Sequence, residues 1–107
     1  YFADVYKADY AFRTAFKVAI KKAGLKRQRW VPDGVTSPLK PVEIDGKARL
    51  LSSVCEPHNC GHRYSILYDP ATRSMTGVYL GRDAKGEART VYFGEPSIAE
   101  ADLLYKN

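Results

Sequence analysis

"PVEIDGKARLLSSV" (residues 41–54) predicts the fold more strongly than any other stretch of the chain. Two strand-like segments flank the dipeptide Asp45-Gly46. An Asp-Gly pair between such segments is a strong signal for a two-residue β-hairpin turn, because both turn residues must adopt a positive φ. We therefore predict a pair of antiparallel strands around this dipeptide.

The following segments have the same strand-like character. "HRYSILYD" (62–69) alternates, so that one face carries Tyr64, Ile66 and Tyr68. "MTGVYL" (75–80) and "ARTVYF" (88–93) also read as strands, and turn-forming residues separate them. About five short strands joined by tight turns indicate an antiparallel meander.

A helix is expected on each side of this strand-rich region. In "DYAFRTAFKVAIKKA" (9–23) one apolar stripe runs through Phe12, Phe16, Ala19, Ile20 and Ala23. Asp9 is a suitable N-cap for this helix, and Gly24 suits the position just after its end. "PSIAEADLLYK" (96–106) predicts a second helix, which begins with a capping box of Ser97 and Glu100. We expect Ile98, Leu103 and Leu104 to bury this helix.

The segment between the first helix and the strands is a connector. "WVPDGVTSPLKP" (30–41) contains three prolines and a Pro-Asp-Gly turn, and we expect Trp30 to anchor it in the core. The predicted fold class is α+β: an antiparallel sheet of about five strands flanked by an N-terminal and a C-terminal helix. At 107 residues the chain is expected to form one domain, residues 1–107.

Charge is unevenly distributed along the chain. The net charge is +5, yet residues 1–30 carry eight Lys/Arg against two Asp, and residues 31–107 carry nine Lys/Arg against ten Asp/Glu. The basic N-terminal segment fits either a solvated helix face or the binding of an anionic partner such as nucleic acid or a membrane surface. No apolar run approaches the length that a membrane span requires.

Both cysteines and one of the two histidines lie in "VCEPHNC" (54–60), and the other histidine, His62, follows at once. The cysteines and histidines are four potential zinc ligands, but zinc sites usually combine ligands from two separated elements. Redox dithiols usually have two residues between the cysteines, and they lie at a helix N-terminus that lowers the pKa of the thiol. This pair has four residues between the cysteines and lies between two predicted strands. A structural disulfide between Cys55 and Cys60 is therefore the main interpretation, which suggests an oxidising compartment.

A disulfide in this position closes a very small ring. The chain-entropy model gives about 2 kcal/mol for six residues, so the bond serves chiefly to stiffen the residues inside it. Pro57 restricts Glu56 as well as itself, and Asn59 tolerates turn conformations. His58 then lies near the tip, either as a recognition residue that loses little entropy on binding or as a side chain that simply faces water.

The same residues resemble a known family. "CEPHNC" (55–60) is similar to the signature loop of the inhibitor of vertebrate lysozyme family, bacterial periplasmic proteins whose loop reads Cys-(Lys/Glu)-Pro-His-(Asp/Asn)-Cys. The resemblance extends through "VEIDGKARLLSSVCEPHNC" (42–60) and "ILYDPATRSMTGVYL" (66–80), and it is thinner in the N-terminal helix. It implies a protruding, disulfide-closed loop on an antiparallel sheet flanked by helices.

The resemblance also implies a function. It makes the chain an inhibitor of animal C-type lysozyme, an enzyme that cleaves a glycosidic bond between two carboxylates. The implied inhibitory loop consists of Cys55, Glu56, Pro57, His58, Asn59 and Cys60. His58 is the implied key contact, which would enter the active-site cleft and hydrogen-bond the catalytic carboxylates.

Further expectations follow from this resemblance. The expected partner is an animal lysozyme or one of the bacterium's own wall-cleaving enzymes. The sequence leaves open whether the chain forms a homodimer. The location is the periplasm, after removal of a signal peptide that "YFADVYKADY" (1–10) does not show. No catalytic residue, cofactor, metal, nucleic acid or membrane partner is expected, and the protein is not expected to be an enzyme. The alternative is a basic nucleic-acid-binding module, which the N-terminal charge and eight tyrosines permit.

Overall fold

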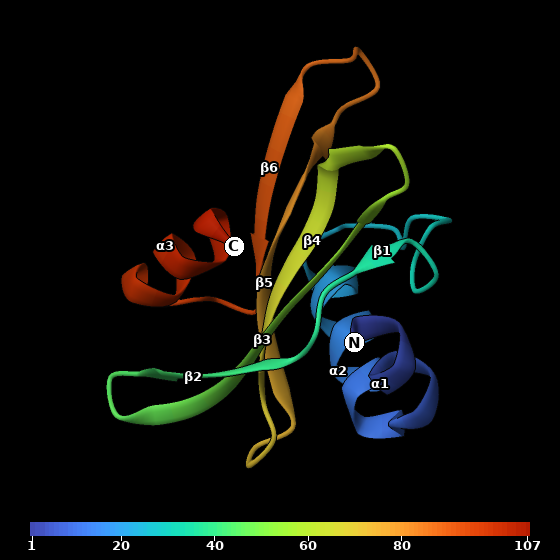
Figure 1. Cartoon of the computed structure of the whole chain (residues 1–107). Coiled ribbons are helices and arrows are strands. Elements are labelled where there is room, and N and C mark those ends of the chain that lie inside the picture. The colour runs from blue at the N-terminus through green and yellow to red at the C-terminus, as the bar shows by residue number, and fades with distance from the viewer.

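The structure, a computed structural model, describes all 107 residues and has the predicted α+β fold (Figure 1). Three helices and six strands follow one another along the chain. They are α1 (Phe2–Ala8), α2 (Tyr10–Lys22), β1 (Val35–Thr36), β2 (Lys40–Ile44), β3 (Lys47–Glu56), β4 (Asn59–Asp69), β5 (Ser74–Arg82), β6 (Ala88–Phe93) and α3 (Ile98–Lys106). The prediction of an antiparallel sheet between N-terminal and C-terminal helices is confirmed.

The sheet is antiparallel throughout and its main order is β1-β3-β4-β5-β6. Strands β2 to β6 form consecutive hairpins, as the meander prediction required. Asp45 and Gly46 both have positive φ, 52° and 76°, which matches the type I′ turn expected between β2 and β3. The additional strand, β1, is only two residues long and pairs with the end of β3 through Val35 and Cys55.

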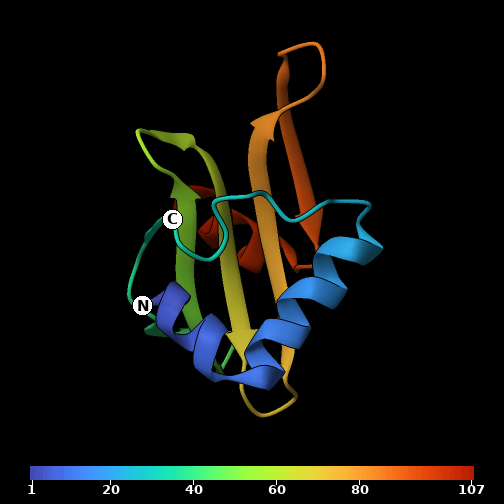
Figure 2. The same cartoon turned by 90° about the vertical axis from the view of Figure 1, so that its right-hand side faces the viewer.

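Figure 1 and Figure 2 show helices on both faces of the sheet: α1 and α2 cover one face, and α3 lies on the other. The side-chain alternation in β4 divides the core accordingly. Tyr64, Ile66 and Tyr68 belong to the larger core beneath α1 and α2, where they meet the buried aromatic rings of Phe12 and Phe16. The smaller core, on the other face, consists of Leu51, Leu67, Val78 and Leu104. Burial of each such side chain contributes about 1.5–3 kcal/mol.

The N-terminal region contains one helix more than the sequence pattern predicted. Asp9 ends α1 and also caps α2, where its side chain accepts a hydrogen bond from the amide of Phe12 at 3.1 Å. The predicted N-cap and the positive φ of Gly24 after α2 are both confirmed. The unpredicted helix α1 buries Phe2 and Tyr6, two aromatic side chains four positions apart on one helix face.

Helix α3 begins with the predicted capping box. Ser97 and Glu100 each accept a hydrogen bond from the other's backbone amide. Leu104 is fully buried, but the prediction for Ile98 was wrong, because this side chain is 91% exposed. Ile98 lies about 200° around the helix from Glu100, and the face that carries Glu100 and Leu104 is the one that meets the sheet.

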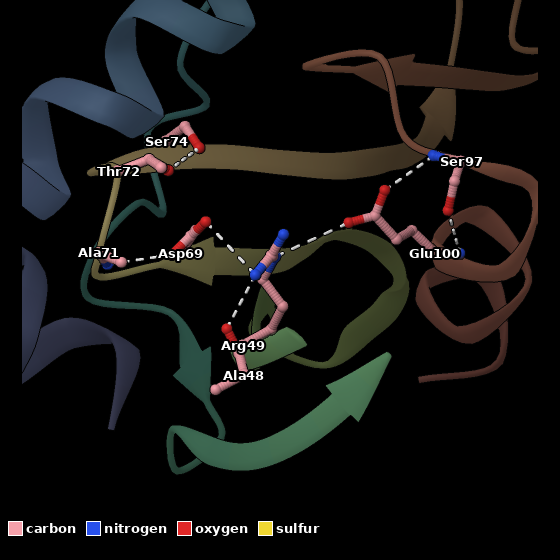
Figure 3. A network of polar contacts seen from close by, with 8 residues as sticks. All are labelled: Ala48, Arg49, Asp69, Ala71, Thr72, Ser74, Ser97 and Glu100. Carbon is pink, nitrogen blue, oxygen red and sulfur yellow. Dashed lines mark hydrogen bonds and ion pairs between the residues drawn. The ribbon is translucent and has the colours of Figure 1, made fainter. Parts of the chain in front are cut away.

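An arginine joins α3 to the sheet (Figure 3). The Arg49 guanidinium on β3 lies 3.3 Å from the Asp69 carboxylate on β4 and 3.9 Å from that of Glu100. All three side chains are at most 16% exposed. Glu100 therefore caps its own helix with one oxygen and faces Arg49 with the other, which fixes how α3 sits on the sheet.

Candidate functional site

The segment predicted as a loop between two strands is the tip of a hairpin that contains a bulge. Strands β3 and β4 extend past Cys55 and Cys60, but the register shifts after the pair of Cys55 with Arg63, so that residues 60–62 have no partner on β3 before Glu56 pairs with Asn59. Only Pro57 and one further residue remain as the turn, at the end of the sheet where the β3–β4 hairpin protrudes (Figure 2). The cysteines therefore lie in strand ends rather than in an irregular loop.

His58 is the second residue of this two-residue turn. Its φ is 61°, in the left-handed region, and Pro57 precedes it with a φ that its ring fixes near −65°. Proline followed by a residue of positive φ is the pattern of a type II turn. The sequence had suggested Asn59 as the turn-tolerant residue, but the left-handed conformation belongs to His58, a residue type that is enriched in that region. The imidazole is exposed at the tip.

The predicted disulfide between Cys55 and Cys60 is present, with 4.9 Å between the two Cα atoms. This separation is within the usual range for a disulfide. Both sulfur atoms are committed to this bond, so neither cysteine offers a thiolate. Groups of three or more His, Cys, Asp or Glu residues arranged to hold a metal ion are also absent from the structure.

A polar cluster braces the hairpin below the turn. The Asn59 side-chain amide donates to Glu56 Oε1 at 2.8 Å, and His62 Nδ1 lies 3.2 Å from the same oxygen. Because a carboxylate only accepts hydrogen bonds, we assign the hydrogen of the imidazole to Nδ1. The sequence placed Glu56 and Asn59 in the site but left His62 out. Its position two residues after Cys60 was the available signal.

The base of the hairpin rests against the connector between α2 and β2. Gly34 lies so close to β3 that a Cβ atom there would collide with the carbonyl oxygen of Cys55 and lie 2.9 Å from that of Trp30. The Trp30 ring packs at 5.5 Å from the Tyr64 ring, which confirms its predicted role as an anchor. The connector therefore holds the strand that carries Cys55 in a fixed position.

Three of the basic residues that suggested nucleic-acid binding share one helix, whereas the tyrosines are dispersed. Lys17, Lys21 and Lys22 are exposed on α2. Four of the eight tyrosines are buried in the core, and the exposed ones lie on four different segments, as Tyr1, Tyr10, Tyr92 and Tyr105. This dispersal gives no specific support to the nucleic-acid alternative, which stays a prediction.

Comparison with known proteins gives no match that indicates a function. No family model matches the chain, and no curated protein matches it. None of the three helices has the length and apolar character needed to cross a bilayer. Fold and site define a small α+β domain that presents a histidine on a hairpin closed by a disulfide.

Proposed function

We propose that this protein inhibits C-type lysozyme by inserting the tip of the β3–β4 hairpin into the active-site cleft. The observation that carries the proposal is the exposed His58 on a turn with little conformational freedom. Pro57, the disulfide and the contacts of Glu56 with Asn59 and His62 all restrict this turn. A turn whose backbone is already ordered loses little entropy when it binds, so its contacts contribute more to affinity.

The chemistry of the cleft suits an imidazole. C-type lysozyme holds two carboxyl groups on either side of the scissile bond, one of which must be protonated to act as the general acid. A protonated His58 would donate one hydrogen bond from each ring nitrogen, and bonds between charged groups are about twice as strong as neutral ones. The positive charge would also favour ionisation of the general acid. Inhibition would then be both steric and electrostatic, with no reaction on the inhibitor.

The environment of Glu56 is compatible with this role. A free carboxylate beside His58 would repel the carboxylates of the cleft. Instead, Glu56 accepts from Asn59 and faces His62 at the base of the hairpin. Its charge is thus partly compensated within the protein. The disulfide and the proposed target together favour a periplasmic location.

The test is lysis of a cell-wall suspension by a chicken-type lysozyme, with and without the protein. We expect native protein to slow lysis, and His58→Ala to weaken binding by about 1–3 kcal/mol, as for an interface hot spot. His58→Asn is the matched variant, because asparagine also adopts the left-handed conformation but lacks the imidazole. If His58→Asn inhibits as well as native protein, the imidazole has no role. If native protein leaves lysis unchanged at micromolar concentration, the inhibitor proposal is wrong.

A further inference from the structure

A notch separates the two hairpins that protrude at the His58 end of the sheet. Strands β4 and β5 pair with each other up to Arg63 and Leu80, and beyond this point each strand pairs only with its other neighbour, β3 or β6. The β3–β4 and β5–β6 hairpins diverge there (Figure 1, Figure 2). The resulting cavity of about 280 Å³ is called the hairpin notch. Its polar lining consists of Asn59, His62, Arg82, Arg89, Thr90 and Tyr105.

The two arginines of the hairpin notch have no acidic partner. Neither Arg82 nor Arg89 forms an ion pair, in contrast to Arg49, which faces two carboxylates. Arg82 Nη1 donates to the carbonyl oxygen of Gly86 at 2.7 Å, which orients the guanidinium and leaves its other N–H groups free. Asp83, next in the chain, uses a carboxylate oxygen to accept from two backbone amides of its own turn.

Further contacts keep the surroundings of the notch cationic. Arg63 donates from Nη2 to the carbonyl oxygen of Tyr105 at 3.0 Å, and its Nε is buried without an acceptor. Glu56 contacts two notch residues, Asn59 and His62, and offsets one of the positive charges. The notch lining contains two arginines and no carboxylate, and the nearest carboxylates that the contacts identify are Glu56 on one hairpin and Asp83 on the other.

The notch is continuous with the proposed inhibitory hairpin, because Asn59 and His62, which both contact Glu56 in the hairpin, also belong to the notch wall. A protein surface seated on His58 would therefore also cover the notch. Arginine and tyrosine are the residue types most enriched at interface hot spots, and Tyr105 is 55% exposed beside the arginines.

We propose that the hairpin notch is a second contact site, which takes an acidic side chain from the rim of the lysozyme cleft. Arg82 and Arg89 donate to its carboxylate, whose two oxygens match the planar fork of a guanidinium. This second contact rests on the function proposed for His58. Under the proposal, the protein selects among lysozymes according to whether a carboxylate lies at the matching position of the enzyme. Local complementarity of this kind operates whatever the net charge of the two proteins.

The test is the affinity for a chicken-type lysozyme, measured by calorimetry at low and at moderate salt. For Arg82→Ala/Arg89→Ala we expect binding about tenfold weaker than native, with a smaller dependence on salt. Arg73→Ala is the control for the single variants, because it removes one positive charge, as each of them does, from the β4–β5 turn at the opposite end of the sheet. We expect it to bind within about twofold of native, since exposed charges farther apart than the Debye length are largely screened.

Single variants separate recognition from folding. The Arg89 side chain makes no hydrogen bond or ion pair within the chain, so Arg89→Ala breaks neither kind of contact, and we expect it to bind about threefold more weakly. If the double variant binds like native while His58→Ala binds weakly, the notch is not a contact site and the inhibitor proposal stands. If Arg73→Ala loses as much affinity as Arg89→Ala, which removes the same single charge, only net charge matters and the notch proposal fails. If native protein does not bind, both proposals fail.

Discussion

Glu56 and His62 face each other across the base of the disulfide-closed hairpin, with 3.2 Å between Oε1 and Nδ1. Residues 56 and 62 lie on either side of the turn that carries His58, with Glu56 inside the disulfide ring and His62 outside it, so the contact is a second link between the two strands beside the disulfide. The two side chains are 36% and 28% exposed, and exposed pairs add little to global stability. The pair therefore acts on the local order of the hairpin more than on the fold.

The first prediction concerns this brace. His62→Ala removes the donor to Glu56, so we expect faster hydrogen exchange at the amides of His58 and Asn59, while the free energy of unfolding changes by less than about 1 kcal/mol. The amide of Gly46, in the turn between β2 and β3, serves as an internal control, because that turn makes no contact with His62. Unchanged exchange at the hairpin tip would mean that His62 does not order the turn, and that Pro57, the disulfide and the contact between Glu56 and Asn59 are sufficient.

The second prediction concerns the disulfide. Cys55→Ser/Cys60→Ser should lower the free energy of unfolding by about 2 kcal/mol, because a ring of six residues constrains the unfolded chain only slightly. The core beneath α1 and α2 lies outside the ring, so we expect the variant to remain folded. Urea denaturation followed by circular dichroism measures the loss. Complete unfolding in the absence of denaturant would show that the bond holds the fold itself.

Local sequence signals predicted the elements whose formation depends on near neighbours. Asp45-Gly46 sets its own turn, and Ser97 with Glu100 caps its own helix, so both features were visible in a few residues. The burial of Ile98 was predicted wrongly, because the orientation of α3 depends on the contact between Glu100 and Arg49, which lie far apart in sequence.

The candidate site was only partly visible in the sequence. The disulfide and the exposed position of His58 followed from residue types and spacing within six residues. Predicting the contact of His62 with Glu56 would have required the register between β3 and β4. Predicting the contact of Gly34 with Cys55 would have required the pairing of β1 with β3. Predicting the notch between the hairpins would have required knowing where β4 and β5 stop pairing, and no local sequence pattern encodes that point.

The third prediction concerns the support of the hairpin by the connector. Gly34→Ala places a Cβ against the carbonyl oxygens of Cys55 and Trp30, and backbone atoms cannot move aside as a flexible side chain can. We expect a loss of about 1–3 kcal/mol in the free energy of unfolding, as for other overpacked sites. Gly61→Ala is the matched control, since nothing lies within 4 Å of a Cβ atom at that position. Equal stability of the two variants in urea would show that β1 can shift away from β3.

The fourth prediction rests on the Asp69 carboxylate in the network of Figure 3. Burial raises the pKa of Asp69, but hydrogen bonds from Thr72 and Ala71 and the charge of Arg49 outweigh it, so this pKa lies below the ordinary value of 3.8. A carboxyl whose pKa is lower in the folded chain stabilises the fold at pH values above its unfolded pKa. That contribution is lost as the pH falls through the lower, folded value.

Asp69→Asn should therefore lower the free energy of unfolding at pH 7 and flatten its decline as the pH falls through 3.8 and below. Asparagine keeps an acceptor for the Ala71 amide, 2.9 Å from the carboxylate in native protein, but it gives Arg49 no charge to face. Asp102→Asn is the control, because Asp102 pairs with Lys106 at the surface, where it is 63% exposed and screened by solvent. Urea denaturation at several pH values measures the three slopes. If native protein and Asp69→Asn decline in parallel below pH 5, acid instability arises from other carboxylates and the network of Arg49 does not set it.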